Sequence, residues 1–365
     1  MNSDSLKVRR ILVIRLGQIG DIVLTAPLVR ALKNRFPLSE ISMLTKARFT
    51  KLSSAIPGLH KTLSCPRSFF SLLDIRHKLR ASDFDIVVDL QNNLKSRRYS
   101  YVVSPKRLFR FHRWRKPRWF FINFPSMRSK ISKPKQIPTQ YLQVASALGI
   151  DDDGLGLELE VKAEWREAAN VLLEEFRTKH DLNAEDKVLI IAPGASRPTK
   201  IWSSEKWVEF LKLAYENGYR HQVIVGAGRT DRRISKIIAS MIQHPLMVTT
   251  DKTSIEVSIG LISLANKMVT NDSGPMHLAA GVGTPLVGIY GPTVEEFGFS
   301  PFRCISEIAQ VEGLDCRPCH PHGPKKCPRG HFKCMDDITP EHLMSKLEKL
   351  DESLIEKSKL LGTAK

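Results

Sequence analysis

The sequence lacks an uninterrupted apolar run long enough to cross a membrane. Its best candidate, residues 278–290, is shorter than the roughly 18 residues that a membrane span needs, and glycine and proline interrupt it. The apolar stretch near the N-terminus is interrupted by Arg15 and Asp21, and no small-residue cleavage site follows it. We therefore expect a cytoplasmic protein without a transmembrane segment.

The sequence also has few cysteines and few aromatic residues. Only 6 of its 365 residues are cysteine and 7% are aromatic, whereas 42% are hydrophobic and 26% are charged. This composition excludes a small disulfide scaffold, a collagen-like chain and a disordered chain. No repeat of roughly 20–50 residues is visible. At about 150 residues per domain, the length predicts two domains.

Acidic residues are absent from one long segment. Residues 91–150 contain no Asp or Glu, although the chain as a whole has 38 acidic residues against 56 Lys and Arg, with a net charge of +18. Such an excess favours an anionic partner: nucleic acid, an acidic membrane surface or a phosphorylated substrate. Aromatic residues lie among the cations of this segment, namely Trp114, Trp119, Phe120 and Phe121.

Short apolar runs that alternate with helical patterns predict the architecture. Continuous runs of buried-strand character occupy residues 11–14, 41–44, 83–89, 188–191, 223–225, 268–270 and 286–290. Helical patterns follow several of them, including residues 21–36, 163–180 and a helix that Ser203 or Ser204 caps. Another helix is expected to begin at a capping box formed by Thr253 and Glu256. This alternation indicates α/β domains with doubly wound parallel sheets.

The strand pattern breaks off after the basic segment and starts again near residue 188. We predict an N-terminal Rossmann-like domain over residues 1–165, which contains the basic segment 91–150, and a C-terminal one over residues 166–340. Residues 341–365 are expected to form an amphipathic helix and a tail, because Pro340 suits a first helical turn and leucines recur behind it.

Polar residues that follow the first strand form the first candidate site. Arg15, Gly17, Gly20 and Asp21 lie between that strand and a helix. The carboxyl ends of parallel strands are where such folds bind ligands, and the glycines allow close backbone approach. The spacing is not that of the dinucleotide fingerprint. Alternatively, Asp21 only caps a helix.

Two further loops follow strands of the second domain. In residues 270–277, Asp272 and Ser273 can cap a helix whose first turn holds Pro275, and such a helix N-terminus binds anions. In residues 193–202, Arg197 and Lys200 can stabilise a departing phosphate. The alternatives are a well-capped helix and two solvated surface cations.

Four cysteines lie close together in the sequence. Cys316, Cys319, Cys327 and Cys334 have a spacing that can hold a structural Zn²⁺, and a loop of reduced thiols without metal is the alternative. The carboxylates of Asp83 and Asp85 are discounted as metal ligands because they stand at a strand entrance.

Three segments together resemble glycosyltransferase family 9, the ADP-heptose:lipopolysaccharide heptosyltransferases. They are residues 14–21 with Pro27, residues 193–196 with Lys200 and Trp202, and residues 271–277. The resemblance extends from about residue 11 to about residue 338 and is weakest over residues 91–150. It implies a GT-B fold, in which two Rossmann-like domains face a central cleft.

The resemblance also implies a reaction and a set of roles. Heptose would pass from ADP-heptose to the inner core of lipopolysaccharide, on a lipid A–Kdo acceptor, with inversion and without a required cofactor. Asp21 then matches the general base, and Lys200 matches the lysine on the donor diphosphate. The expected donor-binding residues are Ser196, Asp231, Asp272, Ser273, Gly274 and His277, and the expected acceptor-binding residues are Arg15, Gly17, Gly20, Lys95 and Arg98.

The basic segment fits an acceptor that is lipid-linked and anionic. Clustered Lys and Arg attract such a surface, and Trp and Phe favour the headgroup level, so we expect peripheral attachment to the inner membrane face. The alternatives are a transferase of another nucleotide-sugar, an epimerase of the same fold, or a nucleic-acid-binding protein that uses residues 91–150. No nucleic-acid-binding signature is visible, so a nucleic-acid partner is not expected. The oligomeric state is left open.

Overall fold

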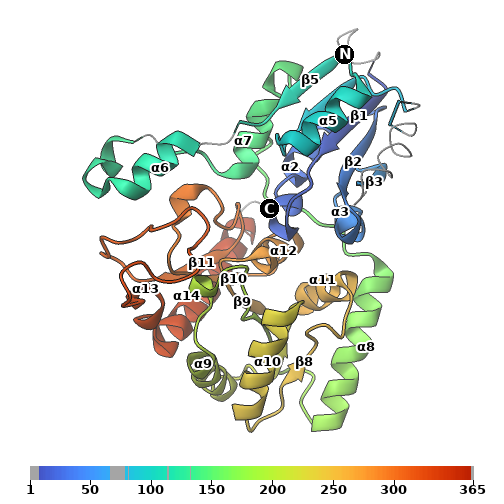
Figure 1. The fold of residues 1–365 in the computed structure, drawn as a ribbon. Coiled ribbons are helices and arrows are strands. Elements are labelled where there is room, and N and C mark those ends of the chain that lie inside the picture. Colours follow the sequence, from blue (N-terminus) through green and yellow to red (C-terminus); the bar gives the residue numbers. More distant parts are fainter. Residues whose placement is uncertain (1–7, 66–78, 81, 113–114, 132, 363–365) are drawn as a thin grey trace. The chain divides into compact units, whose positions relative to one another are not determined.

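The structure is a computed structural model (Figure 1), and it describes residues 8–65, 79–80, 82–112, 115–131 and 133–362. The chain packs into two compact units. The first unit comprises residues 1–114 and 135–160, and the second comprises residues 115–134 and 161–365. Residues 115–134, part of the basic segment, therefore pack with the second unit, although the expected N-terminal domain ran without interruption to residue 165.

The first unit is built on a parallel sheet with the strand order β3-β2-β1-β4-β5. Its strands are β1 (Arg10–Ile14), β2 (Glu40–Lys46), β3 (Lys61–Cys65), β4 (Ile86–Asp89) and β5 (Arg107–Arg110). Its helices are α1 (Ile19–Val23), α2 (Ala26–Arg35), α3 (Thr50–Ser53), α5 (Leu94–Val103) and α7 (Ile137–Val144). Leu12 and Ile14 pack against Tyr99 and Val103 of α5. Ile11 and Val13 on the opposite side are fully buried too, so both faces of the sheet are covered.

The second unit has a parallel sheet with the strand order β11-β10-β9-β6-β7-β8. Its strands are β6 (Val188–Ala192), β7 (His221–Ile224), β8 (Met247–Val248), β9 (Lys267–Asn271), β10 (Leu286–Tyr290) and β11 (Ser306–Gln310). Its helices are α6 (Arg115–Asn123), α8 (Ala163–His180), α9 (Ser204–Glu216), α10 (Arg229–Met241), α11 (Ile255–Leu264), α12 (Gly274–Val282), α13 (Lys333–Asp336) and α14 (Pro340–Gly362). Helices α9, α10 and α14 share one core with the sheet, and α8 and α12 pack against α11.

In both units the strand order reverses beside the first strand. The first sheet reverses between β1 and β4, and the second between β6 and β9, so each is a doubly wound, Rossmann-like sheet. The predicted fold class is therefore confirmed for each unit. The reversal matters for function, because ligands of such sheets bind where the loops leave the carboxyl ends of those two strands.

Several predicted elements need correction in detail. The helical stretch 21–36 is two helices, α1 and α2, because Pro27 stands in the first turn of α2 and cannot continue a helix from before it. Helix α11 begins one residue later than the predicted capping box requires, since Ser254 rather than Thr253 accepts the hydrogen bond from the amide of Val257. Within the described part of the chain, no helix combines the length and the apolar character that spanning a bilayer demands.

Candidate active site

In the first unit, candidate residues gather in the loop between β1 and α1. Arg15 directly follows the strand and is buried, with 2% of its surface exposed. Its guanidinium donates to the carbonyl of Leu90 (Nη1–O 2.6 Å) and pairs with Asp21 (Nη2–Oδ1 2.6 Å). Burial alone would lower the pKa of Arg15, but Tyr141 and Asp21 beside it raise this pKa above its ordinary value. Arg15 therefore stays charged and fixes the Asp21 carboxylate.

The two glycines of this loop have different surroundings. The second Asp21 oxygen accepts from the amide of Gln18 (3.2 Å), which holds the carboxylate over Gly17. A Cβ atom on Gly17 would lie 2.2 Å from that oxygen, so only glycine leaves Asp21 its place. Gly20 is buried within α1. Asp21 itself keeps 22% of its side chain exposed, so a ligand can reach it.

The end of β4 supports this loop from the neighbouring strand. Asp89 is fully buried and accepts hydrogen bonds from the amides of Gln91 and Asn92 and from the Ser96 hydroxyl. The Gln91 side chain accepts from the amide of Leu16 at 3.1 Å, which joins the loops after β1 and β4. The sequence analysis did not single out Asp89 or Gln91. Their position directly after a continuous apolar run was the available signal.

The expected acceptor residues Lys95 and Arg98 lie on α5, which begins at this same edge of the first sheet. Both are exposed. Lys95, Gly17 and Asp21 thus lie where the chain leaves the carboxyl ends of β1 and β4, whereas Arg15 is buried.

The second unit has its own group of candidate residues, an ion pair at the reversal point of its sheet. Lys200 lies in the short 3₁₀ helix Pro198–Lys200 after β6, and Asp272 follows β9. Their side chains pair at 2.6 Å (Nζ–Oδ2), and the hydroxyl of Thr293 donates to the same oxygen at 2.6 Å. Lys200 is 9% exposed, so its ammonium is held in one place.

Helix α12 begins directly behind this pair. Ser273 is its N-cap residue, and Gly274 and Pro275 form its first turn. The predicted side-chain cap is absent, because Asp272 turns to Lys200 and the Ser273 hydroxyl contacts that of Thr270 at 3.3 Å instead. His277 is buried in the helix. The N-terminus of α12 and a lysine ammonium therefore lie together, as an anion site requires.

Two more predicted donor residues lie near the loops after β6 and β7. Asp231, near the start of α10, accepts from the amide of Ala227 at 2.8 Å, and burial raises the pKa of its carboxyl group. A Cβ atom on Gly194 would stand 1.6 Å from an Asp231 oxygen, so the two loops touch at this glycine. Ser196 is exposed in the loop that leads to Lys200.

The cysteine-rich segment, residues 316–334, packs on Lys200 through Gly323. It does not form the predicted zinc site. Cys316 approaches His331 (Sγ–Nε2 3.7 Å), whereas Cys319 faces the carbonyl of Pro292 at 4.0 Å. Burial raises the pKa of Cys319 to about 11 and that of Cys334 to about 12. In the ranges that the structure covers, no three His, Cys, Asp or Glu side chains group as metal ligands would. Zinc binding by Cys316, Cys319, Cys327 and Cys334 is therefore not supported.

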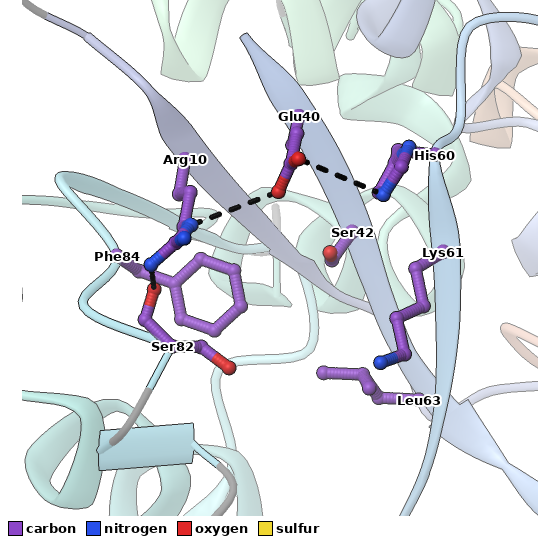
Figure 2. Close-up of a pocket in the computed structure, with 8 residues that line it drawn as sticks. All are labelled: Arg10, Glu40, Ser42, His60, Lys61, Leu63, Ser82 and Phe84. Atoms are coloured by element: carbon purple, nitrogen blue, oxygen red, sulfur yellow. Dashed lines mark hydrogen bonds and ion pairs between the residues drawn. The ribbon is translucent and has the colours of Figure 1, made fainter.

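A small polar pocket opens at the opposite edge of the first sheet (Figure 2). It measures about 230 Å³, and the first residues of three strands line it, namely Arg10, Glu40 and Lys61. Glu40 lies 3.6 Å from the Arg10 guanidinium and 3.8 Å from His60. None of the predicted site residues borders this pocket, which stands at the amino ends of the strands.

Comparisons with known proteins agree with this geometry. The family model described as "Glycosyltransferase family 9 (heptosyltransferase)" matches residues 72–331. The lipooligosaccharide heptosyltransferase 2 of Haemophilus influenzae is 24% identical over 354 residues, which cover 93% of this chain and 99% of that protein.

Two solved structures share the fold. A family 9 glycosyl transferase from Veillonella parvula superposes with a TM-score of 0.75 at 21% identity, over 94% of this chain and 97% of that one. The Escherichia coli ADP-heptose lps heptosyltransferase II superposes with a TM-score of 0.71 at 21% identity, over 96% and 99% of the two chains. The likeness shows a GT-B fold, as the sequence predicted.

Proposed function

The chain belongs to glycosyltransferase family 9 and is a glycosyltransferase, and from this premise we propose that it transfers heptose from ADP-heptose to the inner core of lipopolysaccharide, on a lipid A–Kdo acceptor. One observation carries the donor side of the proposal. The Lys200–Asp272 pair stands at the N-terminus of α12, where a diphosphate gains both a cation and a helix dipole.

The proposed reaction is a single displacement with inversion. The bond between the anomeric carbon and the donor phosphate oxygen breaks, and the acceptor hydroxyl forms the new bond to that carbon. The hydroxyl proton passes to the Asp21 carboxylate, which Arg15 and Gln18 hold in place. The negative charge that develops on the leaving ADP meets the Lys200 ammonium and the positive end of the α12 helix dipole.

The proposal revises two of the predicted roles. Asp272 lies against Lys200, so we assign it to positioning that ammonium rather than to contact with the diphosphate. Arg15 is enclosed, so we assign it to positioning Asp21 rather than to contact with the acceptor. Ser196, Asp231, Ser273, Gly274 and His277 stay in the proposal as donor-side residues, and Gly17, Gly20, Lys95 and Arg98 as acceptor-side residues.

Mass spectrometry of the acceptor tests the proposal. The purified chain is incubated with ADP-heptose and a Kdo–lipid A acceptor, and the acceptor is expected to gain one heptose while ADP is released. Release of ADP without an acceptor product contradicts the proposal. Modification only by a different nucleotide-sugar identifies another transferase, and isomerisation of the sugar on the nucleotide identifies an epimerase.

A further inference from the structure

Residues 115–131 carry an exposed cluster of large apolar side chains. Trp119 is 54% exposed, Phe120 44%, Phe124 41% and Met127 44%. The three rings contact one another, with centroids 5.0 Å apart for Trp119 and Phe120, 5.8 Å for Trp119 and Phe124, and 5.7 Å for Phe120 and Phe124. A contiguous exposed aromatic patch of this kind marks an interaction surface.

The opposite side of this segment is anchored to the second unit. Phe121 is 4% exposed and packs on Phe297 at 6.2 Å. The Arg118 guanidinium lies over the same Phe297 ring at 5.0 Å. Phe121 was predicted to join the exposed aromatics, and it does not, because its side chain supplies the anchor. Trp114, the other ring predicted there, lies outside the described residues.

Arg128 also holds the segment in place through hydrogen bonds. Its guanidinium donates to the carbonyls of Phe121 (2.9 Å) and Arg317 (2.5 Å). Lys133 pairs with Glu296 at 3.1 Å. The exposed rings are therefore displayed on a support that packing and hydrogen bonds hold in place. The rings are thus exposed although the backbone that carries them is fixed.

The charge around the rings indicates the partner. Residues 115–134 contain six Lys and Arg and no Asp or Glu, namely Arg115, Lys116, Arg118, Arg128, Lys130 and Lys133. Arg118, Arg128 and Lys133 also hold the segment on its support, so the segment attracts anions through its net positive charge rather than through six free side chains. A second copy of this patch is disfavoured, because a two-fold contact would bring like charges together. Aromatic rings among cations match the interface of an anionic bilayer, where Trp and Phe lie at headgroup level and Lys and Arg attract lipid phosphates.

We propose that α6 and the turn after it dock on an anionic membrane surface, with Trp119, Phe120 and Phe124 entering the headgroup region. The inference deepens the proposed function, because a lipid-linked acceptor resides in a membrane. It nevertheless has its own measurement, which does not depend on transfer.

Co-sedimentation of the full chain with vesicles tests the docking. We expect binding to vesicles of phosphatidylcholine mixed with phosphatidylglycerol, and much weaker binding to phosphatidylcholine alone. A triple variant, Trp119→Ser with Phe120→Ser and Phe124→Ser (the aromatic variant), should partition into anionic vesicles about tenfold less or weaker still. The rings are exposed and add little to the core, so its thermal unfolding should match that of the wild type.

A matched control removes exposed apolar side chains elsewhere in the same unit. Val171, Ile237 and Met241 are 46%, 37% and 42% exposed, and their replacement by Ser should leave vesicle binding unchanged. Equal vesicle binding by the aromatic variant and the wild type overturns the proposal. So does a loss of binding that both triple variants share, or a wild type that binds single-stranded oligonucleotide but no vesicle.

Transfer assays separate this proposal from the proposed function. With an acceptor stripped of its acyl chains, the aromatic variant should keep wild-type turnover. With the acceptor embedded in anionic vesicles, its turnover should fall in step with vesicle binding. Vesicle binding without any heptose transfer would refute the proposed function alone, and transfer without vesicle binding would refute the docking alone.

Discussion

The Asp21 carboxylate is the proposed base, and its position depends on the groups that hold it. It lies against a buried guanidinium and an amide, which fix its position. Asp21→Asn keeps the size and one oxygen of the side chain but cannot accept a proton. We expect turnover to fall by roughly two to four decades, the usual range for general acid–base catalysis, with ADP binding nearly unchanged. Steady-state kinetics and ADP titration measure the two effects.

The substitution to Asn is preferred over Ala for a physical reason. Removing the carboxylate altogether leaves the Arg15 charge buried with one carbonyl as its main acceptor, and unpaired buried charges destabilise proteins. A folded Asp21→Asn protein with wild-type turnover would remove Asp21 from the mechanism.

His221 is predicted to make the stability of the second unit depend on pH. It is fully buried at the start of β7, where Nδ1 accepts from Arg177 (3.1 Å) and Nε2 faces the carbonyl of Asn183 (2.9 Å). Burial lowers its pKa below the ordinary 6.5. The unfolded chain therefore binds a proton in mild acid that the folded chain refuses, and the free energy of unfolding falls as the pH drops below that ordinary value.

The unfolded state sets the upper limit of this effect. Between about pH 7.5 and about pH 5.5, His221 should lower the free energy of unfolding by up to roughly 1 kcal/mol, the limit for a histidine that takes up its proton only when unfolded. Urea titrations at both pH values, on the wild type and on His221→Gln, measure it. The variant should lose about that much less between the two pH values, and identical losses would contradict the assignment.

For single residues, the sequence predicted where a side chain lies in the fold better than which side chain it contacts. Asp21, Lys200 and Asp272 could be singled out because each follows an apolar strand and so reaches a carboxyl edge. Pairing of Lys200 with Asp272, and of Arg15 with Asp21, could not be predicted. The Lys200–Asp272 pair depends on how the loops after β6 and β9 fold over one another, and the Arg15–Asp21 pair depends on the path of the turn between β1 and α1. From the sequence alone, Asp272 could equally well cap a helix.

Among the elements, central strands were predictable and edge strands were not. Strands β1, β6 and β10 are buried on both faces and show nearly continuous apolar runs, and the buried strand β9 keeps a shorter one at Met268 and Val269. Strands β3, β5 and β11 lie at sheet edges, where β3 and β5 mix exposed with half-buried residues and β11 is mostly half-buried. Their sequences therefore show no clear alternation or run of apolar residues. These segments are strands because they pair with a neighbouring strand.

The cysteine-rich segment is predicted to position Lys200. Gly323 packs on the lysine stem, and the Thr199 hydroxyl donates to the carbonyl of Pro324 at 2.6 Å. A Cβ atom at Gly323 would lie 2.9 Å from Lys200 Cγ, so Gly323→Ala must displace the stem. We expect kcat/KM for the donor to fall by about tenfold to a hundredfold. Lys200→Ala, which removes the ammonium altogether, should lower it at least as much and serves as the reference.

The chain offers a matched control for this substitution. Gly313 has a similar left-handed backbone (φ +72° against +79°), but no atom lies within 4 Å of its added Cβ. Gly313→Ala therefore bears the same backbone strain, about 1 kcal/mol, without touching Lys200. It should lower the unfolding temperature slightly and leave kcat/KM unchanged. Equal kinetics of the two alanine variants would show that the strain, not the contact, matters.

For the whole molecule, the double winding was predictable and the path of one segment was not. Two sets of alternating strands and helices imply two such sheets. Residues 115–134, however, leave the first unit and pack on the second before the chain returns. The anchors Phe121 and Arg128 find their partners, Phe297 and Arg317, more than 170 residues later, and no local pattern encodes a contact of that range.

The net charge of +18 yields the last prediction, because it concerns the molecule rather than a site. A charge of this size attracts any polyanion, so we expect the chain to bind oligonucleotides at low salt without sequence preference. Such binding releases counterions and should weaken by about three decades or more between roughly 50 and 200 mM salt. ADP carries one diphosphate, which in the proposed site faces only one lysine and a helix N-terminus, so its binding should change far less. Paired titrations at both salt concentrations measure this contrast. Oligonucleotide binding that stayed tight and sequence-selective at the higher salt would favour a nucleic-acid function for the basic segment, since an unspecific field cannot discriminate between bases.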